Sequence, residues 1–192
     1  MINILLTGVG GQGTVLAAKL LAQAALSRGW QLRSAETIGM AQRGGSVISH
    51  VRMGNLGETV FEPLLAYASA DLIVAFEPAE AARVLPYLAA EGVLVSASSA
   101  IAPVSAALST SSYEPKEVLT YLAAVVPHFF AVDDASICEK LGSRKVLNTL
   151  LLARALSVAS LEIGVEDLKA AICALVKPQY IDLNLAAVEA AE

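Results

Sequence analysis

Short runs of apolar residues alternate along this chain with longer stretches rich in alanine and leucine. The short runs have the length of buried strands, and the longer stretches have the length of helices that cover a sheet. The expected strands are residues 2–7, 32–35, 46–53, 71–76, 92–96 and 128–132. The expected helices are residues 14–28, 78–90, 115–126, 134–141, 144–163 and 165–176. This alternation predicts an α/β fold, with a Rossmann-like, mostly parallel sheet, helices on both faces and a helical C-terminal region.

The expected strand at residues 46–53 differs from the others in its pattern. One face carries Val47, Ser49, Val51 and Met53, and the other carries Ile48, His50 and Arg52. A mixed second face is typical of a half-exposed strand. This strand is therefore expected nearer to an edge or an interface than to the centre of the sheet.

The chain has 192 residues, of which 56% are hydrophobic and 16% are charged, and its mean hydropathy is +0.62. These values predict a single domain over residues 1–192.

The net charge of -5 leaves no basic face for nucleic acid, so that class of partner is excluded. Residues 92–113 are uncharged, but they include Pro103 and many serines. A membrane-spanning helix needs about 20 predominantly apolar residues, so this segment is not expected to span a membrane. The N-terminus lacks a basic leader, and the chain is expected to be cytoplasmic.

Cysteine and histidine are too sparse to form a metal site. Cys138 and Cys173 are too few to hold an iron–sulfur cluster or a structural zinc ion. His50 and His128 have no second histidine or cysteine at ligand spacing, so each is expected to have a core or surface role. No metal site is predicted, and any redox chemistry must use cofactors on another chain.

Residues 8–13 read Gly-Val-Gly-Gly-Gln-Gly between an expected strand and an expected helix. This pattern removes side chains that would block a phosphate, and the start of the helix offers unpaired N–H groups. The expected anion-binding residues of this glycine loop are Gly8, Gly10, Gly11, Gln12, Gly13 and Thr14. Thr14 stands where a P-loop needs lysine, which excludes a nucleotide-hydrolysing P-loop. Glu36 lies where a dinucleotide fold binds ribose hydroxyl groups.

A second loop, residues 39–45, reads Gly-Met-Ala-Gln-Arg-Gly-Gly and places Arg43 beside Gly44 and Gly45. It follows the second expected strand, so it is expected at the same rim of the sheet as the glycine loop. A cation among residues whose backbone N–H groups can converge favours a phosphate-bearing ligand. A flexible turn with a solvated arginine and a loop that orders on a partner are the alternatives. Glu77 follows the expected strand at residues 71–76, so it is expected at the same rim, where it either orients a ligand or caps the next helix.

Together these segments resemble the gamma-type subunit of 2-oxoacid:ferredoxin oxidoreductases. Residues 39–45, and Phe76-Glu77-Pro78 leading into residues 79–83, most resemble the beta subunit of the indolepyruvate enzymes. Leu141-Gly142-Ser143 and Asn148 also fit the downstream pattern of that group. The resemblance covers nearly the whole chain.

This resemblance implies an enzyme whose complete form decarboxylates a 2-oxoacid on thiamine diphosphate, passes two electrons through iron–sulfur clusters to ferredoxin and forms an acyl-CoA. It places thiamine diphosphate and the clusters on a large partner subunit, so this chain is expected to hold no cofactor tightly, to contribute no catalytic residue and to be inactive alone. The glycine loop and the Arg43 loop are expected to contact coenzyme A phosphates, or to cover the thiamine site, in a homodimer or heteromer. An aryl pyruvate is the expected substrate.

Two other interpretations stay open at the level of sequence. A free-standing oxidoreductase that binds NAD or FAD would use the glycine loop and Glu36, although no substrate domain or hydride-transfer base is evident. A structural module would use the glycines only to pack a helix closely against the sheet.

Overall fold

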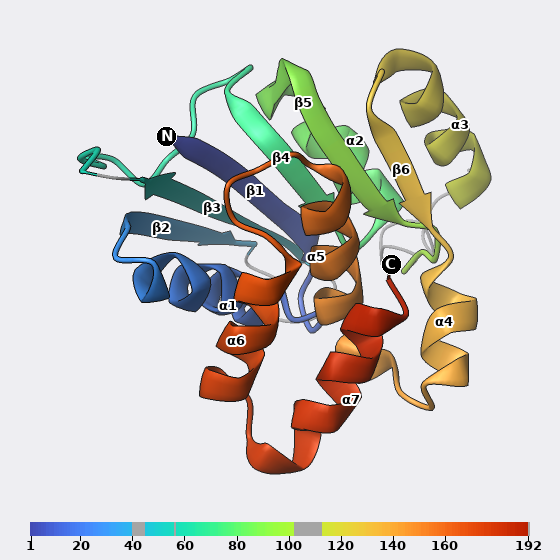
Figure 1. Cartoon of the computed structure of the whole chain (residues 1–192). Helices are drawn as coiled ribbons and strands as arrows, with labels where there is room; N and C mark the ends of the chain where they lie inside the picture. The colour runs from blue at the N-terminus through green and yellow to red at the C-terminus, as the bar shows by residue number, and fades with distance from the viewer. Residues whose placement is uncertain (40–44, 56, 102–112, 192) are drawn as a thin grey trace.

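The computed structural model describes residues 1–39, 45–55, 57–101 and 113–191. Within these ranges a six-stranded sheet, in the order β2-β3-β1-β4-β5-β6, forms the centre of the molecule (Figure 1). The strands are β1 (Ile2–Val9), β2 (Gln31–Ile38), β3 (Ser46–Gly54), β4 (Ala70–Ala75), β5 (Leu88–Ala97) and β6 (Phe129–Val132). The predicted α/β class is confirmed.

The sheet combines a parallel part with an antiparallel part. β1, β4, β5 and β6 pair in parallel, whereas β3 lies antiparallel between β2 and β1. Ser46 at the start of β3 pairs with Val9 at the end of β1, and Val47 pairs with Ile38 at the end of β2. The end of β1, the end of β2 and the start of β3 therefore share one rim of the sheet.

Helices cover both faces of the sheet, as expected. They are α1 (Thr14–Ser27), α2 (Pro78–Val84), α3 (Pro115–Val125), α4 (Asp134–Lys140), α5 (Leu147–Val158), α6 (Val165–Leu175) and α7 (Pro178–Glu189), with 3₁₀ turns η1 (Leu85–Tyr87) and η3 (Arg144–Val146). On one face α1 and α5 lie on the sheet, and α6 and α7 pack on them around a core that includes Leu6 and Leu151. On the other face α2 and α3 enclose a smaller core around Ile73 and Leu122. No helix in the described ranges is long and apolar enough to cross a bilayer.

Two expected helix boundaries are wrong. The helix expected over residues 78–90 ends at Val84, and β5 begins at Leu88. Pro86 lies between them and cannot donate a helical hydrogen bond, while Leu88 pairs with Ala70 of β4. The helix expected over residues 144–163 is instead the turn η3 followed by α5, which ends at Val158. 3₁₀ geometry is frequent where a helix begins.

β3 is the second strand from the edge, and its mixed face is partly buried. Ile48 and Arg52 are half-buried there, whereas His50 is only 5% exposed. Its Nδ1 accepts a hydrogen bond from the Leu65 backbone N–H at 3.2 Å, and its ring meets the Tyr87 ring edge-on at 5.6 Å between centroids. His50 therefore has a structural role in which the neutral ring is required.

Stability should depend on pH through His50. Burial lowers the pKa of His50 below its ordinary value of 6.5, so the unfolded chain takes up this proton at a higher pH than the folded chain. The neutral ring therefore contributes fully to the free energy of unfolding above the ordinary pKa of 6.5. This contribution is lost as the pH falls from 6.5 through the lower pKa of the folded chain. Between about pH 7.5 and pH 5.5, we expect the urea midpoint of the native chain to fall more than that of His50→Gln, whose amide oxygen can still accept the Leu65 N–H. Equal decreases in the two proteins would contradict this role.

Candidate functional site

The glycine loop connects the end of β1 to α1 through two glycines with left-handed backbone conformations. Gly11 has a φ of 103° and Gly13 has a φ of 83°. Residues with a Cβ atom rarely adopt these angles. Gly13 is also the residue that precedes the first turn of α1. The two glycines therefore allow the chain to pass from strand to helix over a very short distance.

The glycine loop is joined to the segment that leads into β3. The Gly10 backbone N–H donates to the Gly45 carbonyl oxygen at 2.9 Å. Gly45, the last residue of the second predicted loop, therefore lies directly beside the glycine loop, as expected for two loops at one rim of the sheet. Arg43 and Gly44 lie outside the described residues. The same hydrogen bond commits the Gly10 N–H to the protein itself.

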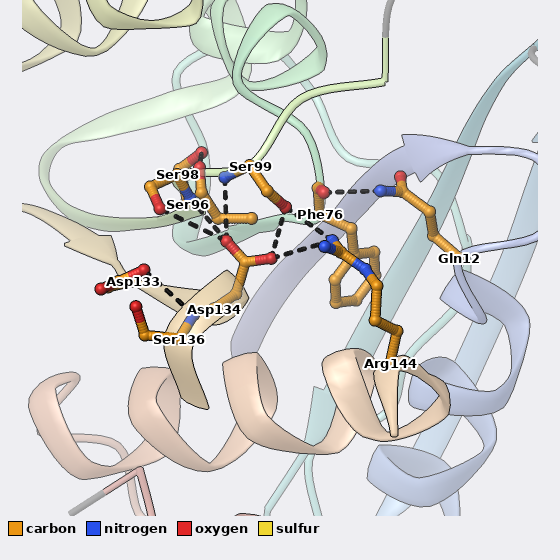
Figure 2. Close-up of polar contacts among 10 residues, drawn as sticks. Gln12, Phe76, Ser96, Ser98, Ser99, Asp133, Asp134, Ser136 and Arg144 are labelled. Carbon is orange, nitrogen blue, oxygen red and sulfur yellow. Dashed lines mark hydrogen bonds and ion pairs between the residues drawn. The ribbon is translucent and has the colours of Figure 1, made fainter. Parts of the chain in front are cut away.

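The Gln12 side chain fixes the glycine loop to the neighbouring strands. Its Oε1 accepts from the Val9 backbone N–H at 2.7 Å. Its Nε2 donates to the Phe76 carbonyl oxygen at 2.7 Å, as Figure 2 shows. Both polar atoms of the amide are thus used within the protein. Gln12 shapes the loop, and its side chain does not itself offer a free donor to an anion.

Close packing explains some of the glycines but not all of them. A Cβ atom on Gly8 would lie 2.8 Å from Gln12 Oε1, and one on Gly13 would lie 2.9 Å from Asn148 Nδ2. Asn148 is 2% exposed and donates to the Gly13 carbonyl oxygen at 3.3 Å. Around Gly11, by contrast, a Cβ atom would meet nothing described within 4 Å. Gly11 therefore borders open space that a ligand could enter.

Thr14 begins α1 directly behind the loop. Its side chain is 3% exposed, and its hydroxyl oxygen has no hydrogen-bond partner among the described residues. The structure thus places Thr14 beside the loop, but buried under it rather than on its exposed side.

A cavity of about 380 Å³ opens beside the glycine loop. Its wall consists of Gly10, Gly11, Gln12, Gly13, Leu16, Ile101, Arg144, Lys145, Leu147 and Asn148. Two cationic side chains, Arg144 and Lys145, thus border the same space as the loop glycines. A cavity with this composition is suited to an anion such as a phosphate group.

A buried carboxylate holds Arg144 in place. Asp134 is completely buried, and its Oδ2 lies 3.2 Å from Arg144 Nη2 (Figure 2). Its Oδ1 accepts from the Ser98 and Ser99 backbone N–H groups at 3.0 and 2.9 Å. The Ser99 hydroxyl bonds to the same carboxylate and accepts from Arg144 Nη2 at 2.8 Å. The guanidinium, whose side chain is 59% exposed, is therefore oriented from one side and accessible from the other.

Arg144 and Lys145 stand at the positive end of a helical segment, where the backbone dipole disfavours cations. Asp134 compensates Arg144, but Lys145 has no ion-pair partner among the described side chains. An anion in the cavity would offset this unfavourable placement. Neither cation was predicted from the sequence, although two adjacent basic residues at the start of an apolar helix are a signal that could have indicated them.

The acidic residues at the same rim stabilise the fold. Glu77 caps α2, since Oε2 accepts from the Glu80 N–H at 3.1 Å and Oε1 accepts from the Tyr113 hydroxyl at 2.5 Å. Burial raises the pKa of Glu77, although the hydrogen bond from Tyr113 acts in the opposite direction. Glu80 accepts from the Ser46 hydroxyl at 2.5 Å. Of the two roles predicted for Glu77, the helix cap is confirmed.

Glu36 does not occupy the position that a dinucleotide fold requires. In that fold the acidic residue follows the strand next to β1. Here β3 lies between β2 and β1, and Glu36 pairs with Ser49 of β3. The geometry therefore disfavours the NAD or FAD alternative.

The two cysteines do not fit an iron–sulfur cluster. Such clusters are held by about four thiolates. Cys138 is buried and Cys173 is exposed, and the chain has no other cysteine. Electron transfer through a cluster therefore cannot be assigned to residues of this chain.

Sequence comparison identifies relatives over almost the full length. A family model described as pyruvate ferredoxin/flavodoxin oxidoreductase matches residues 3–192. Indolepyruvate oxidoreductase subunit IorB of Archaeoglobus fulgidus is 36% identical over 189 residues, which cover 98% of this chain and 92% of the relative. The protein of the same name from Thermococcus kodakarensis is 34% identical over 192 residues, with coverages of 97% and 92%.

Solved structures share the fold. The gamma subunit of keto/oxoacid ferredoxin oxidoreductase from Geobacter sulfurreducens has a TM-score of 0.71 at 20% identity and covers 100% of this chain and 96% of its own. The 2-oxoglutarate:ferredoxin oxidoreductase of Magnetococcus marinus, solved with 2-oxoglutarate, coenzyme A and succinyl-CoA bound, has a TM-score of 0.68 at 16% identity. The match covers 98% of this chain and 30% of that longer chain.

Proposed function

Because the chain belongs to the pyruvate ferredoxin/flavodoxin oxidoreductase family and is an accessory, gamma-type subunit of an indolepyruvate-type 2-oxoacid:ferredoxin oxidoreductase, we propose that it binds the phosphates of coenzyme A in the assembled enzyme. The residues proposed to form this site are Gly8, Gly10, Gly11, Gln12, Gly13, Thr14, Arg43, Gly44, Gly45, Arg144 and Lys145. Gly8, Gly10, Gln12 and Thr14 contribute by shaping the loop, whereas Arg43, Arg144 and Lys145 supply positive charge.

The cavity beside the glycine loop is the main support for this proposal. It combines a glycine with open space around it, a guanidinium oriented by Asp134 and an ammonium at a helix start. Charge-assisted hydrogen bonds to a phosphate are about twice as strong as neutral ones. The coenzyme A found in the Magnetococcus marinus enzyme supports this choice of ligand.

The contribution of this chain to the reaction is positioning. Thiamine diphosphate and iron–sulfur clusters on a large partner subunit supply the decarboxylation chemistry and the electron path to ferredoxin. Residues of this chain hold the coenzyme A phosphates, so that the thiol end is presented to the reacting centre of the partner. Placing two reactants in the right geometry lowers a barrier by several kcal/mol. No side chain of this subunit has to act as an acid or a base.

The names of the curated relatives support an aryl pyruvate as the substrate class. The substrate itself is proposed to bind mainly to the partner subunit, because it reacts on thiamine diphosphate, which is proposed to lie on that subunit. The chain alone is then expected to be inactive and to gain its role only in a heteromer.

Replacing Arg43 with alanine tests the proposed contact from the second loop. In enzyme reconstituted with the partner subunit, Arg43→Ala should raise the Michaelis constant for coenzyme A about 3- to 10-fold, as expected for the loss of one exposed charge-assisted hydrogen bond. Turnover at saturating coenzyme A should be retained. Initial rates over a range of coenzyme A concentrations measure both quantities.

Arg33→Ala is the matched control, because Arg33 is an exposed cation on β2 outside both loops. It should leave the Michaelis constant for coenzyme A unchanged. If Arg43→Ala changes neither this constant nor subunit assembly nor turnover, the Arg43 contact is refuted. If the native chain does not affect coenzyme A binding by the partner at all, the whole proposal fails.

A further inference from the structure

β2 forms a long free edge of the sheet. β2 and β6 are the two edge strands, at opposite sides of the sheet (Figure 1). Natural proteins keep such edges short, bulged or interrupted by proline, because the free N–H and C=O groups can pair with another strand. β6 has only four residues, whereas β2 has eight, contains no proline and pairs with β3 in one continuous register. Within the described part of the chain only β3 pairs with β2, so its other edge is open.

The backbone groups of alternate β2 residues point away from β3. In an antiparallel pair the N–H and C=O of one residue point to the same side, and this side alternates along the strand. Gly39, which follows β2, donates its N–H to the Ser46 carbonyl oxygen of β3 at 2.8 Å, so the odd-numbered residues of β2 bond to β3. In agreement with this, the Leu32 carbonyl oxygen accepts from the exposed Arg33 Nη1 at 3.2 Å. The residues that present their backbone groups at the free edge are Leu32, Ser34, Glu36 and Ile38.

The side chains of β2 are exposed, and their charges balance. Only Leu32 and Ala35 are half-buried, and the other residues of the strand are exposed. Ile38 is 61% exposed, whereas Leu32 packs against the larger core. Arg33 and Glu36 are the only charged residues of the strand, so β2 has no net charge. Two copies of β2 would therefore not repel each other, and pairing would remove the apolar Ile38 side chain from water.

The sequence of β2 is complementary to itself in one antiparallel register. With Ala35 opposite Ala35 of a second copy, Leu32 lies opposite Ile38 and Ser34 lies opposite Glu36. The backbone groups of all four edge residues then have partners, an apolar pair forms at each end, and the serine hydroxyl can donate to the carboxylate. Sliding the register by two residues places either Glu36 opposite Glu36 or Leu32 opposite Glu36, and a slide of one residue puts the paired side chains on opposite faces. Backbone and side chains thus favour the same register.

We propose that β2 pairs with β2 of a second copy of this chain, so that two sheets join into one continuous sheet about a two-fold axis at Ala35. Two-fold dimers are the commonest symmetric assemblies of soluble proteins. Ile38 of the second copy would extend the core through its contact with Leu32, on the face that α1 covers. Because strands run in opposite directions across this axis, the two glycine loops would lie at opposite ends of the joined sheet. Each loop would then be available to a separate partner subunit.

A disulfide across the axis tests the register. In full-length chain that carries Cys173→Ala, which removes the exposed native thiol, Ala35→Cys should form a disulfide-linked dimer. The Cα atoms of such an opposed pair lie about 4.5 Å apart, within the range that a disulfide spans. Thr37→Cys is the matched control, because Thr37 lies on the same face of β2 but about 13 Å along the strand from its counterpart. It should cross-link at least about 10-fold more slowly, as non-reducing electrophoresis measures.

A proline at the free edge tests the pairing itself. The Ser34 N–H points away from β3, so Ser34→Pro keeps the ladder to β3 and removes a donor that only the second copy would use. In sedimentation equilibrium it should raise the dissociation constant of the dimer about 10-fold or more, since the donor is lost from both copies. Ser34→Ala keeps the N–H and should change this constant less than about threefold. Thermal melting of the two variants verifies that both are folded.

Three results would overturn the dimer through β2. They are a native chain that stays monomeric at about 100 μM, equal cross-linking of the two cysteine variants, and a dimer that a folded Ser34→Pro chain forms as tightly as the native one. Loss of the Ala35→Cys cross-link when the partner subunit is added would assign the edge to that subunit and would also overturn the proposal. The coenzyme A assignment does not depend on these results, because Arg43→Ala tests it separately.

Discussion

Replacing Arg144 with alanine is expected to raise the Michaelis constant for coenzyme A about 10- to 100-fold in the assembled enzyme, because a hydrogen bond to a charged group contributes about 1.5–3 kcal/mol. Asp134 and Ser99 hold the guanidinium in one orientation, so little of this energy is spent on ordering the side chain. Turnover at saturating coenzyme A should change little, since the guanidinium is assigned to binding and not to the reacting atoms. Initial rates at varied coenzyme A concentration separate these two effects.

Lys140→Ala is a suitable control for Arg144→Ala. Lys140 is an exposed cation at the end of α4 and is not part of the cavity wall. It should leave the Michaelis constant for coenzyme A unchanged and so exclude a general effect of surface charge. A large loss of turnover in Arg144→Ala with an unchanged Michaelis constant would contradict the role in binding.

Replacing Gly13 with alanine is expected to destabilise the chain by about 2–5 kcal/mol. The left-handed backbone at Gly13 costs a residue with a Cβ atom about 1–2 kcal/mol. The new Cβ atom would also lie 2.9 Å from Asn148 Nδ2, and relieving such an overlap in a packed region costs about 1–3 kcal/mol. For a domain of this size the melting temperature should fall by about 4–20 °C, and denaturant titration gives the free energy directly.

Gly11→Ala separates the two causes. Gly11 has a φ of 103°, but a Cβ atom there would meet nothing described within 4 Å. It should therefore show only the backbone cost, about half the effect of Gly13→Ala. Equal losses in the two variants would mean that Asn148 moves aside without cost and that its contact with the loop does not matter for stability.

Much of the fold could be predicted from the sequence because the decisive signals are local. The apolar run of residues 2–7 and the glycines after it define the first strand and the turn into α1. Glu77 and Pro78 mark the start of α2, since the carboxylate caps the helix and proline fits its first position. The position of the glycine loop at the rim follows from the same local pattern.

The rest of the site depends on contacts between distant residues, which no local pattern specifies. Asn148 bonds to Gly13 across 135 positions, and Arg144 reaches Asp134 and Ser99 from a helix start. The antiparallel insertion of β3 beside β1 is also a property of strand order, which hydrophobic periodicity does not encode. For this reason the spacing of Glu36 alone suggested a ribose-binding role, which the position of β3 between β2 and β1 disfavours.

The Gln12 side chain joins the glycine loop to β1 and, through the Phe76 carbonyl, to the residue that follows β4. The loop thus moves with the rigid sheet, and its conformational entropy is lost when the chain folds and not when a ligand arrives. Association at the loop is then opposed mainly by dehydration of the ligand and of the two cations. Preorganisation of this kind would strengthen the binding of the phosphate-bearing ligand proposed for this site.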